Sequence, residues 1–117
     1  NAMIKVIHNN CPNSKAILEY LDEHNVQIQI IDVSTSPLSI AELGTLFKKL
    51  NKKPSKIIEK ALALGKTIFG YKEDINEDQA LEIIQSNPGI IQYPILIKGK
   101  VAMQGLPIEN VNFFLEK

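Results

Sequence analysis

The sequence predicts an α/β fold in which a mixed four-stranded sheet is assembled from two halves, with a helical insertion between them. Three observations predict it. The first third of the chain alternates strand, helix and strand signals, the last third has two short strands around a glycine turn and then a helix, and the middle shows only helical periodicity. No linker, repeat or low-complexity segment divides the 117 residues, so we expect one domain over residues 3–117.

The first half begins with a strand and a helix. Residues 4–7 alternate and are rich in β-branched side chains, which predicts a strand ending at residues 8–10. Pro12 suits the first turn of a helix, because its missing N–H is not needed there. The helix is predicted over residues 12–23, with one face made of Ile17, Tyr20 or Leu21, and His24.

Residues 26–32 complete this half as a second strand. Their pattern alternates apolar and polar until it becomes fully apolar, as in a strand that enters a buried sheet. Two strands joined by a helix form a right-handed unit with parallel strands. Because Cys11 directly precedes Pro12, it is expected at or just before the N-terminus of the helix.

The insertion opens with two predicted helices. The first follows a turn over residues 34–39 and presents one apolar face, made of Ile40, Leu43, Phe47 and Leu50. Ser55 is expected to cap a shorter second helix, which runs to Leu64 and is ended by Gly65.

A third helix is predicted to close the insertion. Asn76 and Gln79 form a capping pair at its start. The helix runs through Ile84 and stops at residues 86–88, which end in a proline.

The last half is predicted to be a hairpin followed by a helix. Residues 95–97 and 101–103 flank a turn in which Gly99 supplies a positive φ. Pro107 opens the final helix, whose inner face is made of Ile108, Val111, and Phe114 or Leu115. A parallel strand–helix–strand half joined to an antiparallel hairpin and helix is the thioredoxin-like, or glutaredoxin-like, arrangement.

Composition excludes several classes of protein. All 13 basic residues are lysines and balance 13 acidic residues, which argues against a nucleic-acid binder. A single cysteine excludes an internal disulfide framework and a zinc site of several cysteines. No apolar run approaches the ~18 residues of a membrane span, so we expect a cytoplasmic protein with no membrane partner. Asn1-Ala2 ahead of Met3 is interpreted as a tag remnant.

Cys11 is the candidate catalytic residue. A helix N-terminus favours the thiolate, the form of cysteine that acts as a nucleophile. Ser14 lies one turn on and can donate a hydrogen bond to the sulfur, while His8 and Lys15 can add positive charge or a proton route. The alternatives are a small buried Cys11 and a structural histidine at the strand end. We expect no metal, because only His24 could join these groups.

Two further features lie outside this segment. Tyr93-Pro94 precedes a β-rich run, and sequence alone favours a trans peptide bond there. Seven lysines and one acidic residue, Glu59, lie within residues 48–66. They are either the solvated faces of two helices or a surface that attracts an oxyanion, a glutathione carboxylate or an acidic partner protein.

Two neighbouring segments carry a resemblance to a known family: residues 8–15, His-Asn-Asn-Cys-Pro-Asn-Ser-Lys, and residues 18–21, Leu-Glu-Tyr-Leu. Together they resemble the active-site segment of the ArsC family of glutaredoxin-coupled arsenate reductases and their relatives. Residues 87–97 resemble the later family segment that ends in Arg-Pro and a β-branched residue. The resemblance implies a thioredoxin fold with the family cysteine at Cys11 and the family cis-proline at Pro94.

The chain departs from this family at the arginines that bind an oxyanion. Their places correspond to Lys15, Lys56, Tyr93 and the segment that begins at Gln104. Lysine places a charge without the bidentate fork of arginine, and tyrosine supplies neither at neutral pH. The candidates for shaping a cleft and binding an anion are Lys56, Tyr93, Pro94 and Gln104, and Lys15 would also attract an anionic partner.

The resemblance implies a thiol-dependent oxidoreductase with no bound cofactor. Cys11 would attack a disulfide, a glutathione mixed disulfide or an arsenate ester, and an external thiol, glutathione with or without glutaredoxin, would release the product. The alternative is a non-catalytic regulator similar to Spx, whose lysine-rich insertion would contact RNA polymerase. A third hypothesis is a relative that keeps the fold and has lost the catalytic activity.

Overall fold

The computed structural model describes residues 3–115 and divides the chain into two units. The first unit comprises Asn1–Pro37 and Gln92–Lys117, and the second comprises Leu38–Ile91. Asn1 and Ala2, the predicted tag remnant, lie outside the described residues. The second unit contains the predicted helical insertion, and the prediction of one domain over residues 3–117 stays a prediction.

The first unit contains the predicted mixed sheet. Its strands are β1 (Ile4–His8), β2 (Ile28–Asp32), β3 (Ile95–Lys98) and β4 (Val101–Gln104), in the order β2-β1-β3-β4. β1 pairs in parallel with β2 and antiparallel with β3, and β3 pairs antiparallel with β4. The predicted four-stranded α/β architecture is confirmed.

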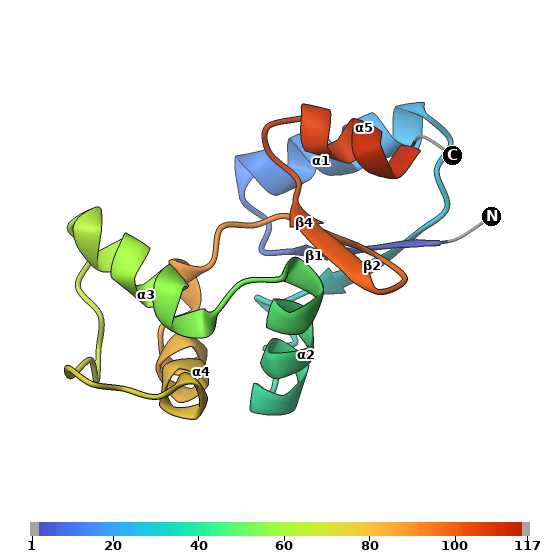
Figure 1. The fold of residues 1–117 in the computed structure, drawn as a ribbon. Helices are drawn as coiled ribbons and strands as arrows, with labels where there is room; N and C mark the ends of the chain where they lie inside the picture. The colour runs from blue at the N-terminus through green and yellow to red at the C-terminus, as the bar shows by residue number, and fades with distance from the viewer. Residues whose placement is uncertain (1–2, 116–117) are drawn as a thin grey trace. The chain divides into compact units, whose positions relative to one another are not determined.

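Two helices cover the same face of this sheet, α1 (Pro12–Glu23) and α5 (Glu109–Leu115) (Figure 1). Their inner faces and the sheet form one apolar core, made of Ile4, Val6, Ile17, Leu21, Leu96, Val111 and Phe114. Each fully buried aliphatic or aromatic side chain stabilises the fold by roughly 1.5–3 kcal/mol. This core fixes α1, and therefore its N-terminus, against β1.

Three details of this unit differ from the sequence prediction. β2 begins at Ile28 and is an edge strand, so Ile30 is half exposed despite the apolar run that predicted a buried strand. His24 caps the C-terminus of α1 and is exposed, and does not belong to its inner face. Pro107 precedes α5 by two residues, and Ile108 is exposed because it lies before the first helical turn.

The second unit contains α2 (Ile40–Leu50), α3 (Pro54–Ala63), α4 (Glu77–Ser86) and a short 3₁₀ turn, η1 (Pro88–Ile90). α4 packs against both α2 and α3 (Figure 1). The predicted capping pair at Asn76 and Gln79 is confirmed as a reciprocal capping box. Leu43 and Phe47 of α2 are buried as predicted, whereas Ile40 is exposed at the first turn.

The predicted cap of α3 is wrong. Ser55 lies inside the first turn, Lys53 occupies the N-cap without a side-chain hydrogen bond, and the helix ends at Ala63. The cap comes from Glu77 on α4, whose carboxylate accepts hydrogen bonds from the Ser55 N–H at 3.0 Å and from the Ser55 hydroxyl at 2.7 Å. A tertiary contact therefore replaces the local cap.

These bonds make the stability of the chain depend on Glu77 and on pH. The Ser55 N–H and hydroxyl hold the pKa of Glu77 below its ordinary value. A carboxylate with a lowered folded pKa stabilises the fold fully above the unfolded value of ~4.3 and loses that contribution as pH falls through the folded pKa.

We expect Glu77→Gln to lower the free energy of unfolding by about 1 kcal/mol at neutral pH, since the bonds are charge-assisted but exposed to solvent. Urea denaturation from neutral to acid pH measures the difference, which should shrink as the pH falls. Glu73→Gln, an exposed glutamate outside these contacts, is the matched control. A loss of unfolding free energy in Glu77→Gln that stays the same at acid pH would contradict this account.

Candidate thiol site

The loop between β1 and α1 places Cys11 at the helix N-cap. Its backbone is extended, with φ −75° and ψ 162°, and its Sγ accepts the Ser14 N–H at 3.4 Å. The sulfur thus takes the place that a serine or aspartate oxygen has in an ordinary cap. Because Pro12 occupies the first helical position and donates no N–H, the free donors of the first turn begin at Asn13.

Ser14 contacts the sulfur with its side chain as well as its backbone. The residue is fully buried, and its Oγ lies 3.4 Å from the Cys11 Sγ. Burial raises the pKa of the Cys11 thiol, but hydrogen bonds from the Ser14 side chain and backbone and from the N–H groups of Asn13 and the cysteine itself outweigh it. The pKa of the thiol therefore lies below its ordinary value, which favours the reactive thiolate.

Asn9 joins the cysteine to the serine. Its Oδ1 accepts the Cys11 N–H at 3.3 Å and the Ser14 hydroxyl at 3.4 Å. The sequence prediction left Asn9 out of the site. The signal that could have found it is its position two residues before the cysteine, where an asparagine oxygen reaches a backbone N–H two residues on.

Asn10 and Asp32 hold the other side of the loop. Asn10 has a φ of 63°, a left-handed conformation that asparagine tolerates better than most residues. Its Nδ2 donates to Asp32 Oδ2 at 2.9 Å. The parallel register pairs Asp32 with His8, so the end of β2 lies beside the start of the loop. Hydrogen bonds from the Ser34 side chain and backbone, and to a smaller extent from Asn10, keep the pKa of Asp32 below its ordinary value.

His8 and Lys15 flank the site without touching the sulfur. His8 is buried at the end of β1, and its Nδ1 accepts the Asn10 N–H at 3.2 Å. Among the described residues, no hydrogen bond joins His8 to Cys11. Lys15 is exposed, and its backbone N–H donates to the Cys11 carbonyl at 3.1 Å, which is the first bond of α1. The thiolate roles predicted for these two side chains stay predictions.

The Tyr93-Pro94 peptide bond is cis. The trans bond favoured by sequence alone is wrong, and the cis-proline implied by the family resemblance is confirmed. The Tyr93 carbonyl lies 4.0 Å from the Cys11 Sγ, so the cis-proline segment lies beside the thiol. Tyr93 is buried, and burial raises its pKa to about 12, so its side chain stays neutral and cannot replace an arginine.

Gly105 supports Pro94 from the other side. Its N–H donates to the Pro94 carbonyl at 2.8 Å, and a Cβ at this position would lie 2.8 Å from Pro94 Cγ. Only glycine fits this approach without moving the proline. Gln104 ends β4 half-buried, and its carbonyl accepts a hydrogen bond from Asn110 Nδ2 at 3.0 Å. The predicted cleft residue is thus next to the glycine that contacts Pro94.

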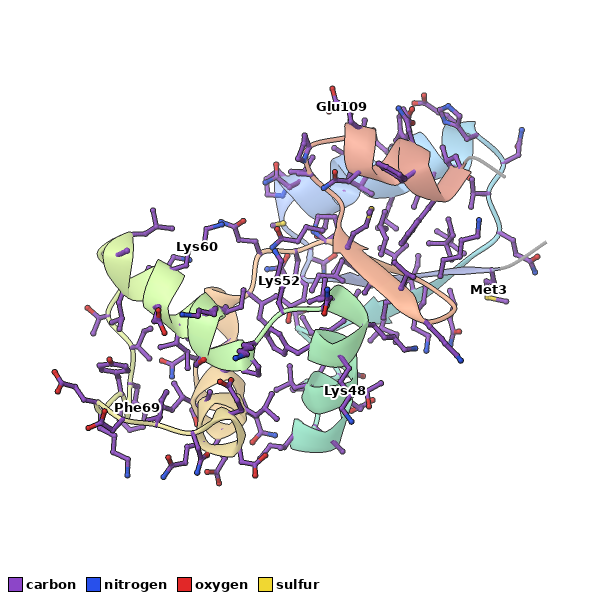
Figure 2. The ribbon with its side chains drawn as sticks, viewed as in Figure 1. Met3, Lys48, Lys52, Lys60, Phe69 and Glu109 are labelled. Carbon is purple, nitrogen blue, oxygen red and sulfur yellow. The ribbon has the colours of Figure 1, made fainter. Side chains whose placement is uncertain are left out.

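Lys56 belongs to the second unit. It is exposed, and its Nζ pairs with Glu59 at 3.4 Å. The other lysines of residues 48–66 are also exposed, apart from the half-buried Lys49. Figure 2 labels three members of this set, Lys48, Lys52 and Lys60.

Neither a metal centre nor a membrane helix is present in residues 3–115. No three histidine, cysteine, aspartate or glutamate side chains lie together in a way that could hold a metal ion. No described helix has both the length and the apolar character required to cross a bilayer.

Comparison with known proteins identifies the family. The sequence model of the ArsC family matches residues 7–114. The chain belongs to the ArsC family. An arsenate reductase of Neisseria meningitidis serogroup A is 26% identical to it, and the match covers 96% of this chain and 97% of the relative. The global transcriptional regulator Spx 2 of Lactococcus lactis is 27% identical, with 92% of this chain and 81% of the relative covered.

Solved structures share the fold of this ArsC-family chain. An arsenate reductase from Vibrio cholerae superposes with a TM-score of 0.75 at 22% identity, over 96% of this chain and 97% of that one. A protein described as a possible arsenate reductase from Streptococcus mutans gives a TM-score of 0.65 at 19% identity, over 97% and 100%. The predicted thioredoxin-like fold is confirmed.

The hydrogen bond from Ser14 to the sulfur yields a direct prediction. Ser14→Ala removes the hydroxyl donor and leaves the backbone cap, so the thiolate loses one hydrogen bond worth about 1 kcal/mol. We expect Cys11 to react with iodoacetamide about fivefold more slowly at neutral pH, with equal rates at a pH where the thiol of both proteins is ionised. Ser36→Ala, an exposed serine whose side chain is not part of the thiol site, is the control. Equal neutral rates for wild type and Ser14→Ala would disprove the contribution of the hydroxyl.

Proposed function

We propose that the chain catalyses thiol–disulfide exchange through Cys11. The single observation that carries the proposal is the use of the Cys11 sulfur as the N-cap of α1, where it accepts the Ser14 N–H and has a lowered pKa. A thiolate is the form that attacks a disulfide sulfur. The cis Tyr93-Pro94 segment lies beside the thiol, with the Tyr93 carbonyl 4.0 Å from the sulfur.

The proposed cycle uses one protein thiol. The Cys11 thiolate attacks the glutathione sulfur of a mixed disulfide, a new S–S bond forms between Cys11 and glutathione, and the original partner leaves as a thiolate. Because the chain has no second cysteine, an external thiol must break this adduct. The thiolate of a second glutathione, or of a glutaredoxin, attacks the glutathione sulfur of the adduct, forms a new disulfide with that glutathione and releases the Cys11 thiolate.

Arsenate is a weaker substrate candidate. The Neisseria relatives carry the name arsenate reductase, which suggests a cycle through an arsenate ester of Cys11. The chain contains no arginine, so nothing in it supplies the paired, planar hydrogen bonds that guanidinium groups give an oxyanion. Lys15, close to the thiol in sequence, and Lys56 in the insertion supply only point charges for an anionic partner. We therefore place sulfur substrates first.

The test is the intact mass of the protein after exposure to oxidised glutathione. We expect one glutathione adduct on the folded wild type, formed faster than on the same chain unfolded in urea, and released by reduced glutathione. Cys11→Ser is the control and should gain no mass. A folded protein that forms the adduct no faster than the unfolded chain would contradict the proposed activity.

A second candidate is a regulator that acts by binding. Relatives named global transcriptional regulator Spx match 92% of this chain. The exposed lysines of residues 48–66 lie on α2 and α3, between these helices and just after α3, and offer a basic surface. In this proposal that surface contacts RNA polymerase. Spx-type redox switches use a pair of cysteines, which this chain lacks.

Binding to purified bacterial RNA polymerase tests the second candidate. We expect charge reversal at Lys52, Lys53 and Lys60 to abolish a genuine complex, while the matched change Lys100→Glu in the β3–β4 turn leaves it intact. The regulator is ruled out when the wild-type protein shows no saturable binding at moderate ionic strength.

A further inference from the structure

We propose that Asn9 is a positioning residue for the Cys11 thiol. While the thiol is neutral, Asn9 Oδ1 accepts the hydrogen bond of the Ser14 hydroxyl; when the thiol ionises, the hydroxyl donates that hydrogen bond to the sulfur instead. The inference rests on the proposed function in one respect, since it takes the Cys11 thiolate to be the reactive species. Asn9 is not among the site residues predicted from the sequence.

The orientation of the Asn9 amide follows from its contacts. The Cys11 N–H is a donor and lies 3.3 Å from Oδ1, so the oxygen and not the nitrogen of the amide faces the loop. The same oxygen lies 3.4 Å from the Ser14 Oγ, and it can only accept the hydroxyl proton. Asn9 therefore offers one oxygen to two donors of the site.

Ser14 has a single hydroxyl proton and two acceptors for it. The Cys11 Sγ and the Asn9 Oδ1 each lie 3.4 Å from its Oγ. Because Ser14 is fully buried, water does not offer a third partner. The hydroxyl can donate to the asparagine or to the sulfur, but not fully to both at once.

The two ionisation states of Cys11 use this choice differently. In the neutral state the thiol donates to the Ser14 Oγ, and the Ser14 hydroxyl donates to Asn9 Oδ1. When a base in solvent removes the thiol proton, the sulfur becomes an acceptor, and the Ser14 hydroxyl turns to it. The Asn9 oxygen then keeps only the Cys11 N–H. Ionisation thus costs the bond to Asn9, and Asn9 moderates the reactivity of the thiol.

The pH profile of Cys11 alkylation by iodoacetamide tests this competition. Asn9→Ala leaves the Ser14 hydroxyl no partner but the sulfur, and we expect the neutral-pH rate to rise about threefold through a lower midpoint, with the high-pH plateau unchanged. A residue that merely supports the loop would instead give a higher midpoint or an altered plateau when removed. Either of those outcomes overturns the proposal.

A double-mutant cycle with Ser14→Ala isolates the hydroxyl. Without the hydroxyl, Asn9 has no Ser14 hydrogen bond to accept. The increase in the neutral-pH alkylation rate caused by Asn9→Ala should therefore become clearly smaller in the Ser14→Ala background. An increase of equal size in both backgrounds would show that Asn9 acts by another route and would contradict the proposal.

Asn9→Asp serves if the alanine variant fails to fold, because the carboxylate keeps both acceptor contacts. It binds the hydroxyl more tightly and adds a negative charge near the sulfur, so we expect the neutral-pH rate to fall roughly tenfold. A rate equal to or above that of the wild type would refute the competition. Alkylation needs no disulfide substrate, so this result and the glutathione-adduct test fail independently.

Discussion

The hydrogen bonds at the N-terminus of α1 are the interaction on which the site depends. The Cys11 sulfur accepts the Ser14 N–H that would otherwise have no partner at the start of the helix. The same donor stabilises negative charge on the sulfur. Helix capping and thiol activation are therefore one contact, and the core that holds α1 against β1, with Val6, Ile17 and Leu21 among its members, indirectly holds the thiol in place.

The site activates its sulfur with neutral groups. Burial acts against the thiolate, and the backbone and hydroxyl donors of the first turn overcome it without a cationic side chain in contact. In a family with relatives named arsenate reductase, this chain combines the capped cysteine and the cis-proline Pro94 with a complete absence of arginine. This combination is why we propose a sulfur substrate: the nucleophile is present, whereas the paired hydrogen bonds of guanidinium groups that bind an oxyanion are not.

Local pattern was sufficient to predict the elements and the position of Cys11, because alternation, helical spacing and Pro12 are properties of neighbouring residues. It failed where a distant segment decides the outcome. Glu77 caps α3 from another helix, and Gly105 meets Pro94 across the sheet end. The exposure of Ile30 follows from the strand order, which no single strand encodes.

The most direct test of the account is titration of the Cys11 thiolate by its ultraviolet absorbance, with Cys11→Ser as the blank. The account predicts that the folded protein ionises at a lower pH than the same thiol in the urea-unfolded chain, because the donors at the start of α1 exist only in the fold. A folded midpoint equal to or above the unfolded one would contradict it, since burial would then outweigh the cap.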